Sequence, residues 1–131
     1  MRTMESRFSR QMKKGVLEML VLGLVCERPG HGYELIHRLA TRSEGFLQTK
    51  EGTLYPILYR LEDDGLIVSS WQTGGAGRAA PKKIYTATQA GRSALLAMQA
   101  EWQALCHCVQ TCTLFHKEDA ADVPAQHFTK A

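Results

Sequence analysis

Apolar residues recur at helical spacing along most of this chain, and two short β-prone runs interrupt the pattern after its midpoint. The first helix is predicted over about residues 10–27 and ends before Pro29 and Gly30. Its inward face consists of Met12, Val16, Met19, Leu20 and Leu24, broadened by Val21 and Leu22. A second helix is predicted over about residues 31–41, with Ile36, Leu39 and Ala40 inward.

The segment over residues 50–67 is the most informative, because its two helical faces differ in chemistry. Its apolar face consists of Leu54, Ile57, Leu58 and Leu61. The opposite face carries Thr53, Pro56, Tyr59 and Arg60, with Tyr55 at its margin. Hydrogen-bonding groups and a fixed cation suit a helix that lies in a DNA groove. Since Pro56 is best tolerated in a first turn, the helix is predicted to begin at Gly52 or Thr53, with Thr53 as N-cap. Gly65 is the predicted C-terminal stop.

The residues after this helix predict a wing. Residues 66–71 are β-prone, residues 72–81 form a glycine-rich loop, and residues 82–86 form a second short strand. Helix, strand, basic loop and strand together predict a winged helix-turn-helix, mainly α with a small β-hairpin. The wing cations are Arg78, Lys82 and Lys83.

A long last helix is predicted to begin at Thr88 as its N-cap. From Leu95 its apolar positions alternate steps of three and four through Met98, Trp102, Leu105, Val109, Cys112 and His116. This heptad stripe predicts dimerisation. The same stripe can also pack against the first helix of its own chain, and this does not exclude dimerisation. The predicted organisation is a flexible basic arm over 1–9, a winged-helix DNA-binding domain over 10–87, a dimerisation helix over 88–116 and a disordered tail over 117–131.

Charge and composition narrow the class of protein. The net charge is only +3, but residues 1–14 carry five basic side chains against the single acid Glu5, which suits contact with phosphates. No run of residues reaches the length that a membrane span needs, and no signal peptide is predicted. The protein is expected in the cytoplasm, with its four cysteines reduced. No catalytic motif or phosphate loop is found, so an enzyme is not expected.

The DNA-contact residues are predicted by their place and chemistry. Those facing the bases are Thr53, Tyr55, Tyr59 and Arg60. Thr49 and Lys50, which precede the helix, are expected at phosphates, as are the three wing cations. Tyr33 suits either a phosphate contact or packing.

Several motifs together resemble the PadR family of transcriptional regulators. They are Lys-Gly-Val-Leu-Glu-Met-Leu over 14–20, His-Gly-Tyr-Glu-Leu over 31–35, Gly-Thr-Leu-Tyr-Pro over 52–56 and Lys-Ile-Tyr-Thr-Ala-Thr-Gln-Ala-Gly over 83–91. The resemblance implies a dimeric winged-helix repressor, often released from DNA by a small aromatic or drug-like ligand. Trp102 is similar to a tryptophan in the last helix of multidrug-binding members. The implied effector site is Val16, Leu20, Leu95, Trp102 and Cys106, and the expected dimer contacts are Met98, Leu105, Val109 and Cys112.

Two alternatives stay open. One is a redox- or metal-responsive repressor that uses the cluster from Cys106 to Cys112. Cys108, Cys112 and His116 spread over roughly 12 Å of helix, which is too far for one tetrahedral ion. A pair such as Cys112 and His116, completed by a second chain, stays open. Buried cysteines that act as small apolar residues are the favoured interpretation, so neither a metal nor another cofactor is expected. The other alternative is a winged helix used only for protein–protein contact, against which the wing cations and the polar helix face argue.

Overall fold

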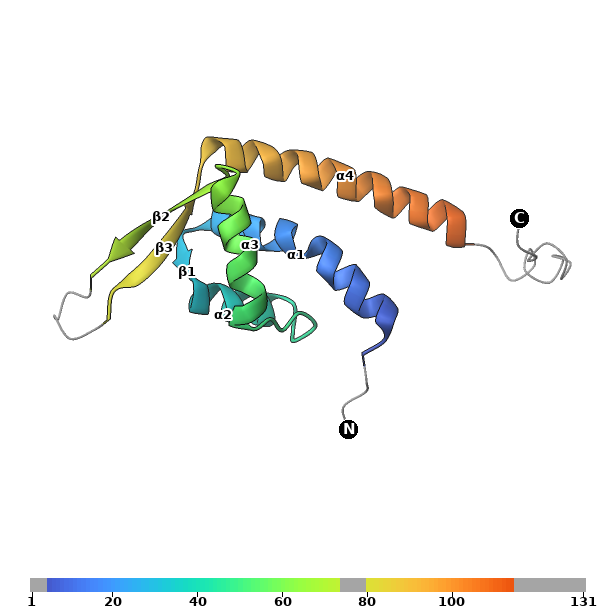
Figure 1. Cartoon of the computed structure of the whole chain (residues 1–131). Coiled ribbons are helices and arrows are strands. Elements are labelled where there is room, and N and C mark those ends of the chain that lie inside the picture. The colour runs from blue at the N-terminus through green and yellow to red at the C-terminus, as the bar shows by residue number, and fades with distance from the viewer. Residues whose placement is uncertain (1–4, 74–79, 115–131) are drawn as a thin grey trace, which may run out of the picture. The chain divides into compact units, whose positions relative to one another are not determined.

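The computed structural model describes residues 5–73 and 80–114 and confirms the predicted winged-helix fold (Figure 1). In chain order, the elements are α1 (Arg7–Glu27), β1 (Gly30–His31), α2 (Gly32–Arg42), α3 (Glu51–Asp63), β2 (Ile67–Gln72), β3 (Lys82–Ala87) and α4 (Gln89–Thr113). Two compact units divide the chain after Gln99, so α4 contributes to both of them. Each helix within residues 5–73 and 80–114 is too short or too polar to span a bilayer.

The sheet contains the predicted hairpin and one strand that the sequence did not predict. Its antiparallel order is β1-β3-β2, with β3 in the centre. In the extra pairing, Gly30 lies opposite Tyr85 and His31 lies opposite Ile84. Two residues are too few to give an alternating pattern, so periodicity could not indicate β1. Its effect is to attach the start of α2 to the wing.

The core lies where α1, α2, α3 and the sheet meet. On α1 the buried side chains are Leu17, Val21, Leu22, Leu24 and Val25. The predicted α1 face was therefore wrong in part, because Met12 is exposed and Val16 and Leu20 are not fully buried. Since α1 contacts α2, α3 and β3, its buried surface is set by three neighbours instead of one stripe.

The inward face of α2 was also wrong in part, because Arg38 occupies it along with Leu35 and Leu39. Arg38 is only 8% exposed, and its Nη2 donates to the carbonyl of Leu24 at 2.8 Å and to Glu27 Oε1 at 3.0 Å. Hydrogen bonds from Arg42 and Arg38 hold the pKa of the Glu27 carboxyl below its usual value. The guanidinium thus satisfies carbonyls at the end of α1 and joins it to α2.

The start of α3 differs from the prediction. The helix begins at Glu51 with Lys50 as N-cap, and the N–H groups of Thr53 and Leu54 donate to the Lys50 carbonyl at 3.0 and 2.9 Å. Thr53 is therefore helical and is not the N-cap. Pro56 lies inside the helix, where it has no N–H to donate to the carbonyl of Gly52. The first-turn rule for proline is a preference, and here the surrounding packing overrides it.

The end of α3 agrees with the prediction. Gly65 has a φ of 76°, a left-handed conformation that glycine adopts without steric cost. Its N–H donates to the carbonyl of Glu62 at 3.0 Å, and the N–H of Leu66 donates to that of Leu61 at 2.9 Å. This pair of bonds is the Schellman arrangement, and it turns the chain directly into β2.

The start of α4 is tied to the same turn. As predicted, Thr88 is the N-cap, and its Oγ1 accepts from the N–H of Gly91 at 3.0 Å. The same hydroxyl donates to the carbonyl of Gly65 at 2.7 Å. A Cβ added at Gly91 would lie 2.0 Å from the carbonyl oxygen of Leu66. Only glycine therefore permits α4 to begin this close to the strand.

Gly91→Ala is expected to destabilise the protein by about 1–3 kcal/mol, because backbone must move to relieve the overlap with the Leu66 carbonyl. Gly15→Ala is the matched control, since a Cβ there meets nothing within 4 Å. That change is expected to stabilise α1 by about 0.5–1 kcal/mol through helix propensity. Urea unfolding of both variants measures the difference, and equal effects at the two sites would contradict this account of the junction.

Candidate nucleic-acid interface

The two faces of α3 are separated as its sequence predicted. Leu54, Leu58 and Leu61 are fully buried, whereas Tyr59 and Arg60 on the opposite side are exposed. Thr53 is exposed too. The buried face fixes the rotation of the helix about its axis, so the polar side chains have a defined direction outward.

Tyr55 lies between the two faces and packs over the first turn of α2. A Cβ added at Gly32 would lie 2.3 Å from the Tyr55 hydroxyl oxygen, so glycine makes room for this side chain. Burial, then the Glu51 carboxylate and Tyr59, raise the pKa of the Tyr55 hydroxyl, which therefore stays a hydrogen-bond donor. The rings of Tyr55 and Tyr59 lie 6.2 Å apart and are tilted by 37°.

The wing brings Lys82 and Lys83 to the same surface. The Nζ of Lys83 lies 5.8 Å from the ring centroid of Tyr59 and 5.8 Å from that of Tyr85. Lys82 is exposed beside it. A residue predicted to face bases and one predicted to face phosphates are therefore neighbours, although the sequence separates them widely.

Arg60 has a partner that sequence reasoning missed. Its Nε donates to Glu18 Oε1 of α1 at 3.2 Å, and both side chains are partly exposed. No local pattern relates these positions, because the contact depends on how α1 and α3 pack. The charge of the guanidinium is thus partly neutralised by the Glu18 carboxylate.

The other predicted phosphate contacts have different surroundings. Lys50 is exposed at the N-cap of α3. The Thr49 hydroxyl is buried and has no hydrogen-bond partner within residues 5–73 and 80–114. Arg78 lies outside the described residues. Lys50 is therefore better placed than Thr49 to meet a phosphate in this conformation.

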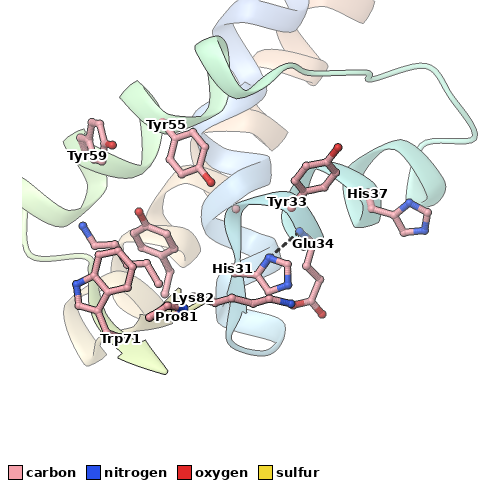
Figure 2. A pocket seen from close by; sticks show the side chains of 12 residues that line it. His31, Tyr33, Glu34, His37, Tyr55, Tyr59, Trp71, Pro81 and Lys82 are labelled. Carbon is pink, nitrogen blue, oxygen red and sulfur yellow. Dashed lines mark hydrogen bonds between the residues drawn. The ribbon is translucent and has the colours of Figure 1, made fainter. Parts of the chain in front are cut away.

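A surface hollow of about 830 Å³ lies between α2, α3 and the wing (Figure 2). Four of the predicted DNA-contact residues line it: Tyr55, Tyr59, Lys82 and Lys83. The remaining lining is His31, Gly32, Tyr33, Glu34, His37, Trp71, Pro81 and Tyr85. Of these, sequence reasoning had considered only Tyr33 for contact with DNA. The hollow could not be predicted from the sequence, because its lining residues come from separate elements that only the fold brings together.

Tyr85 is the most buried of the large side chains of the hollow, at 1% exposed. Its hydroxyl has no hydrogen-bond partner within the described part of the chain. Burial, followed by the nearby Tyr59, Glu62 and Tyr55, raises its pKa to about 12, so the hydroxyl keeps its proton at neutral pH. A buried donor without an acceptor costs free energy and is uncommon in folded proteins.

The predicted effector and dimer residues divide between the two units. Leu95 and Met98 belong to the first unit and pack against its core, and Leu95 contacts α1 near Gly23. In the second unit, Trp102 is 37% exposed, and Leu105 and Val109 are about half exposed. Cys106 is half-buried there, while Cys108 and Cys112 are exposed. Trp102, Leu105 and Val109 therefore present apolar surface to solvent within the described residues of the single chain.

The structure tests the metal alternative only within the described residues, which do not include His116. Within residues 5–73 and 80–114, His, Cys, Asp and Glu side chains nowhere form a group of three or more that could hold an ion. Cys108 and Cys112 are exposed in the single chain, so burial of these two thiols would need a second surface.

Comparison with known proteins places the chain in a family. The profile of the transcriptional regulator PadR-like family matches residues 21–97. A transcriptional regulator of Mycobacterium tuberculosis is 37% identical over 86 residues, which cover 66% of this chain and 75% of that protein. The negative transcriptional regulator PadR of Bacillus subtilis is 31% identical over 80 residues, which cover 61% of this chain and 43% of that protein.

Solved structures agree with the sequence match. The crystal structure of a PadR family transcriptional regulator from Eggerthella lenta superposes with a TM-score of 0.73 at 34% identity, covering 83% of this chain and 91% of that one. The profile match includes α3, the wing and the start of α4, which carry the polar helix face and the wing cations described above. The chain therefore belongs to the PadR-like family and is a transcriptional regulator with a winged-helix DNA-binding fold.

Proposed function

We propose that this chain acts as a dimeric repressor in the cytoplasm, and that a small flat ligand held between its two copies releases it from operator DNA. The observation that carries the DNA-binding part is the meeting of α3 and the wing at one surface. The polar face of α3 points outward there, and Lys83 lies 5.8 Å from the ring of Tyr59. The negative transcriptional regulator of Bacillus subtilis supports repression as the direction of control.

The contacts to DNA divide into two kinds. Thr53, Tyr59 and Arg60 are on the exposed face of α3 and are assigned to base edges, with Tyr55 beside them. Lys82 and Lys83, with Lys50 at the start of α3, are assigned to phosphates, as are Arg78 and Thr49. Phosphate contacts supply most of the salt-dependent affinity, whereas base contacts select the sequence.

Dimerisation is supported by the exposed apolar side chains along the heptad stripe of α4. Trp102, Leu105 and Val109 expose large apolar surface in the single chain, and burial of such surface drives association. Met98 and Cys112 extend the same stripe at heptad spacing. A two-fold dimer also suits the function, because paired recognition helices reach successive major grooves about 34 Å apart.

The ligand is assigned to the seam of the dimer. Trp102 offers a flat ring for stacking, and Val16, Leu20, Leu95 and Cys106 are the other side chains assigned to that slot. A ligand there changes the packing of the two copies and hence the separation of the two α3 helices. The ligand weakens DNA binding only by the difference between its binding free energies for the two arrangements of the dimer. For a typical coupling this difference is about 1–3 kcal/mol.

The wing and α3 are expected to respond differently to mutation. Replacing Lys82 and Lys83 by Ala should weaken binding to all duplexes equally and flatten the salt slope by about 0.9 for each phosphate that is no longer neutralised. Arg60→Ala should instead change the preferred sequence, because a base contact is removed. Selection from a random duplex library and titration at two salt concentrations measure these effects.

Glu18→Gln is the control for Arg60, because it leaves the guanidinium in place and removes the charge of its partner. This variant should bind DNA more tightly and keep the sequence preference of the original protein. If Arg60→Ala kept the sequence preference of the parent and the wing variant changed it, the roles assigned to α3 and the wing would be reversed.

Val109→Glu is expected to raise the dissociation constant of the dimer at least about tenfold, because a charge would be buried in an apolar seam. Gln110→Glu adds the same charge one position away, outside the heptad stripe, and should leave the dimer intact. Sedimentation velocity at micromolar concentration distinguishes the two variants. A monomeric parent protein at that concentration would rule out the dimer.

Trp102→Ala is expected to keep DNA binding and to lose the response to a flat ligand at the seam. Gel-shift titrations of the parent and the variant with the same duplex and ligand measure both properties. A Trp102→Ala protein that still left DNA at the same ligand concentration would place the effector site elsewhere.

A further inference from the structure

We propose that the hollow between α2, α3 and the wing is a separate ligand site, which binds a flat aromatic anion and excludes DNA while it is occupied. All its lining residues belong to the first unit, so the site is complete within one chain. It is distinct from the seam proposed above, since neither Trp102 nor any other residue of the second unit contributes to it.

Aromatic side chains form much of the wall. Four elements contribute flat surfaces (Figure 2). The side chains are Tyr33 of α2, Tyr55 and Tyr59 of α3, Trp71 of β2 and Tyr85 of β3. Trp71 is 68% exposed, which is costly for so large an apolar ring unless another group covers it. The volume of about 830 Å³ lies within the range of small-molecule sites, which is about 300–1,000 Å³.

The hollow also contains an unused hydrogen-bond donor. The Tyr85 hydroxyl is buried, protonated and without a partner within the described residues. His31 supplies a second donor at Nε2. Its other ring nitrogen, Nδ1, accepts from the N–H of Glu34 at 3.3 Å. A neutral imidazole that accepts at Nδ1 carries its proton on Nε2. A ligand with acceptor oxygens would therefore supply the acceptor that the Tyr85 hydroxyl lacks within the described residues, and His31 Nε2 offers it a second donor.

The charges favour an anion over a cation. Lys82 and Lys83 are the cations of the hollow, and Lys83 already occupies the place over the rings of Tyr59 and Tyr85 that a cationic ligand would take. The acid of the lining, Glu34, is paired with Arg28 at 3.7 Å. The anionic end of the ligand is thus assigned to the lysines, with its ring against the aromatic wall.

Occupancy of this site has a direct effect on DNA. Tyr55, Tyr59, Lys82 and Lys83 are assigned both to the hollow and to the DNA contact, so one partner has to leave before the other binds. This exclusion rests on the proposed DNA-binding function, whereas ligand binding itself does not. A ligand here needs no rearrangement of a dimer to release DNA.

The two tryptophans of the chain allow a direct test, because Trp71 lines the hollow and Trp102 lies in the other unit. Their indole N–H resonances are assigned with Trp71→Phe and Trp102→Phe variants, and 2-naphthoate is titrated into the labelled full-length protein. The Trp71 resonance is expected to shift, whether or not the Trp102 resonance also moves through separate binding at the seam. Adenosine monophosphate is titrated in parallel. The comparison shows whether the site binds an aromatic carboxylate or an aromatic phosphate.

Two comparison compounds define the chemistry. Cyclohexanecarboxylate has the charge without an aromatic ring, and 2-naphthalenemethanol has the ring without the charge; each is expected to bind at least about tenfold more weakly than 2-naphthoate, which corresponds to about 1.4 kcal/mol. Equal binding of the alcohol would overturn anion recognition. A naphthoate shift at Trp102 alone, or no shift at millimolar concentration, would overturn the site.

Tyr85→Phe tests the buried hydroxyl without a loss of packing, because it removes a donor that has no partner within the described residues. The variant should fold with unchanged or higher stability and bind 2-naphthoate about tenfold more weakly. Gly15→Ala, which lies outside the lining of the hollow and meets nothing within 4 Å, is the control and should bind as the parent does. Unchanged affinity in Tyr85→Phe would overturn the role of this hydroxyl.

Competition is measured with a random-sequence duplex at low salt. Simultaneous binding of duplex and 2-naphthoate would overturn the exclusion. A protein that binds 2-naphthoate at Trp71 but no duplex would contradict the proposed DNA-binding function and leave the ligand site standing, so the two failures are distinguishable.

Discussion

The burial of one face of α3 is the constraint on which the interface depends. Leu54, Leu58 and Leu61 are fully buried, and each stabilises the fold by about 1.5–3 kcal/mol relative to an exposed side chain. A rotation of the helix would expose them, so the directions of Tyr59 and Arg60 are fixed by residues that never touch a partner. The turn at Gly65 then carries this orientation into β2, and thereby into the wing.

Local signals made the order of the elements and several of their ends predictable. The two faces of α3, the stop at Gly65 and the cap at Thr88 each depend on residues within one or two turns of one another. The start of α3 was wrong because the preference of proline for a first turn is weaker than the packing of the whole helix. Burial of Arg38 was missed, because its acceptors belong to another helix.

The candidate site was predictable only as a set of exposed residues. Sequence reasoning found the polar face of α3 and the wing lysines, since each follows from position within one element. The pairing of Arg60 with Glu18 and the meeting of Trp71 with Tyr85 depend on helix packing and on the register between strands. No single element contains that information. The seam proposed for α4 is harder still to predict, since its partner would be another chain.

Pro56 has a consequence for the hydration of the recognition surface. Because proline has no N–H, the carbonyl of Gly52 lacks the hydrogen bond that an unbroken α-helix would supply at this point. Gly52 is exposed, and no side chain of its own covers the backbone, so water can reach this oxygen. Any macromolecule that docks against the first turns of α3 has to replace that water with a donor or retain it as a bridge. The main chain of α3 therefore adds an acceptor to a surface whose side chains are largely donors.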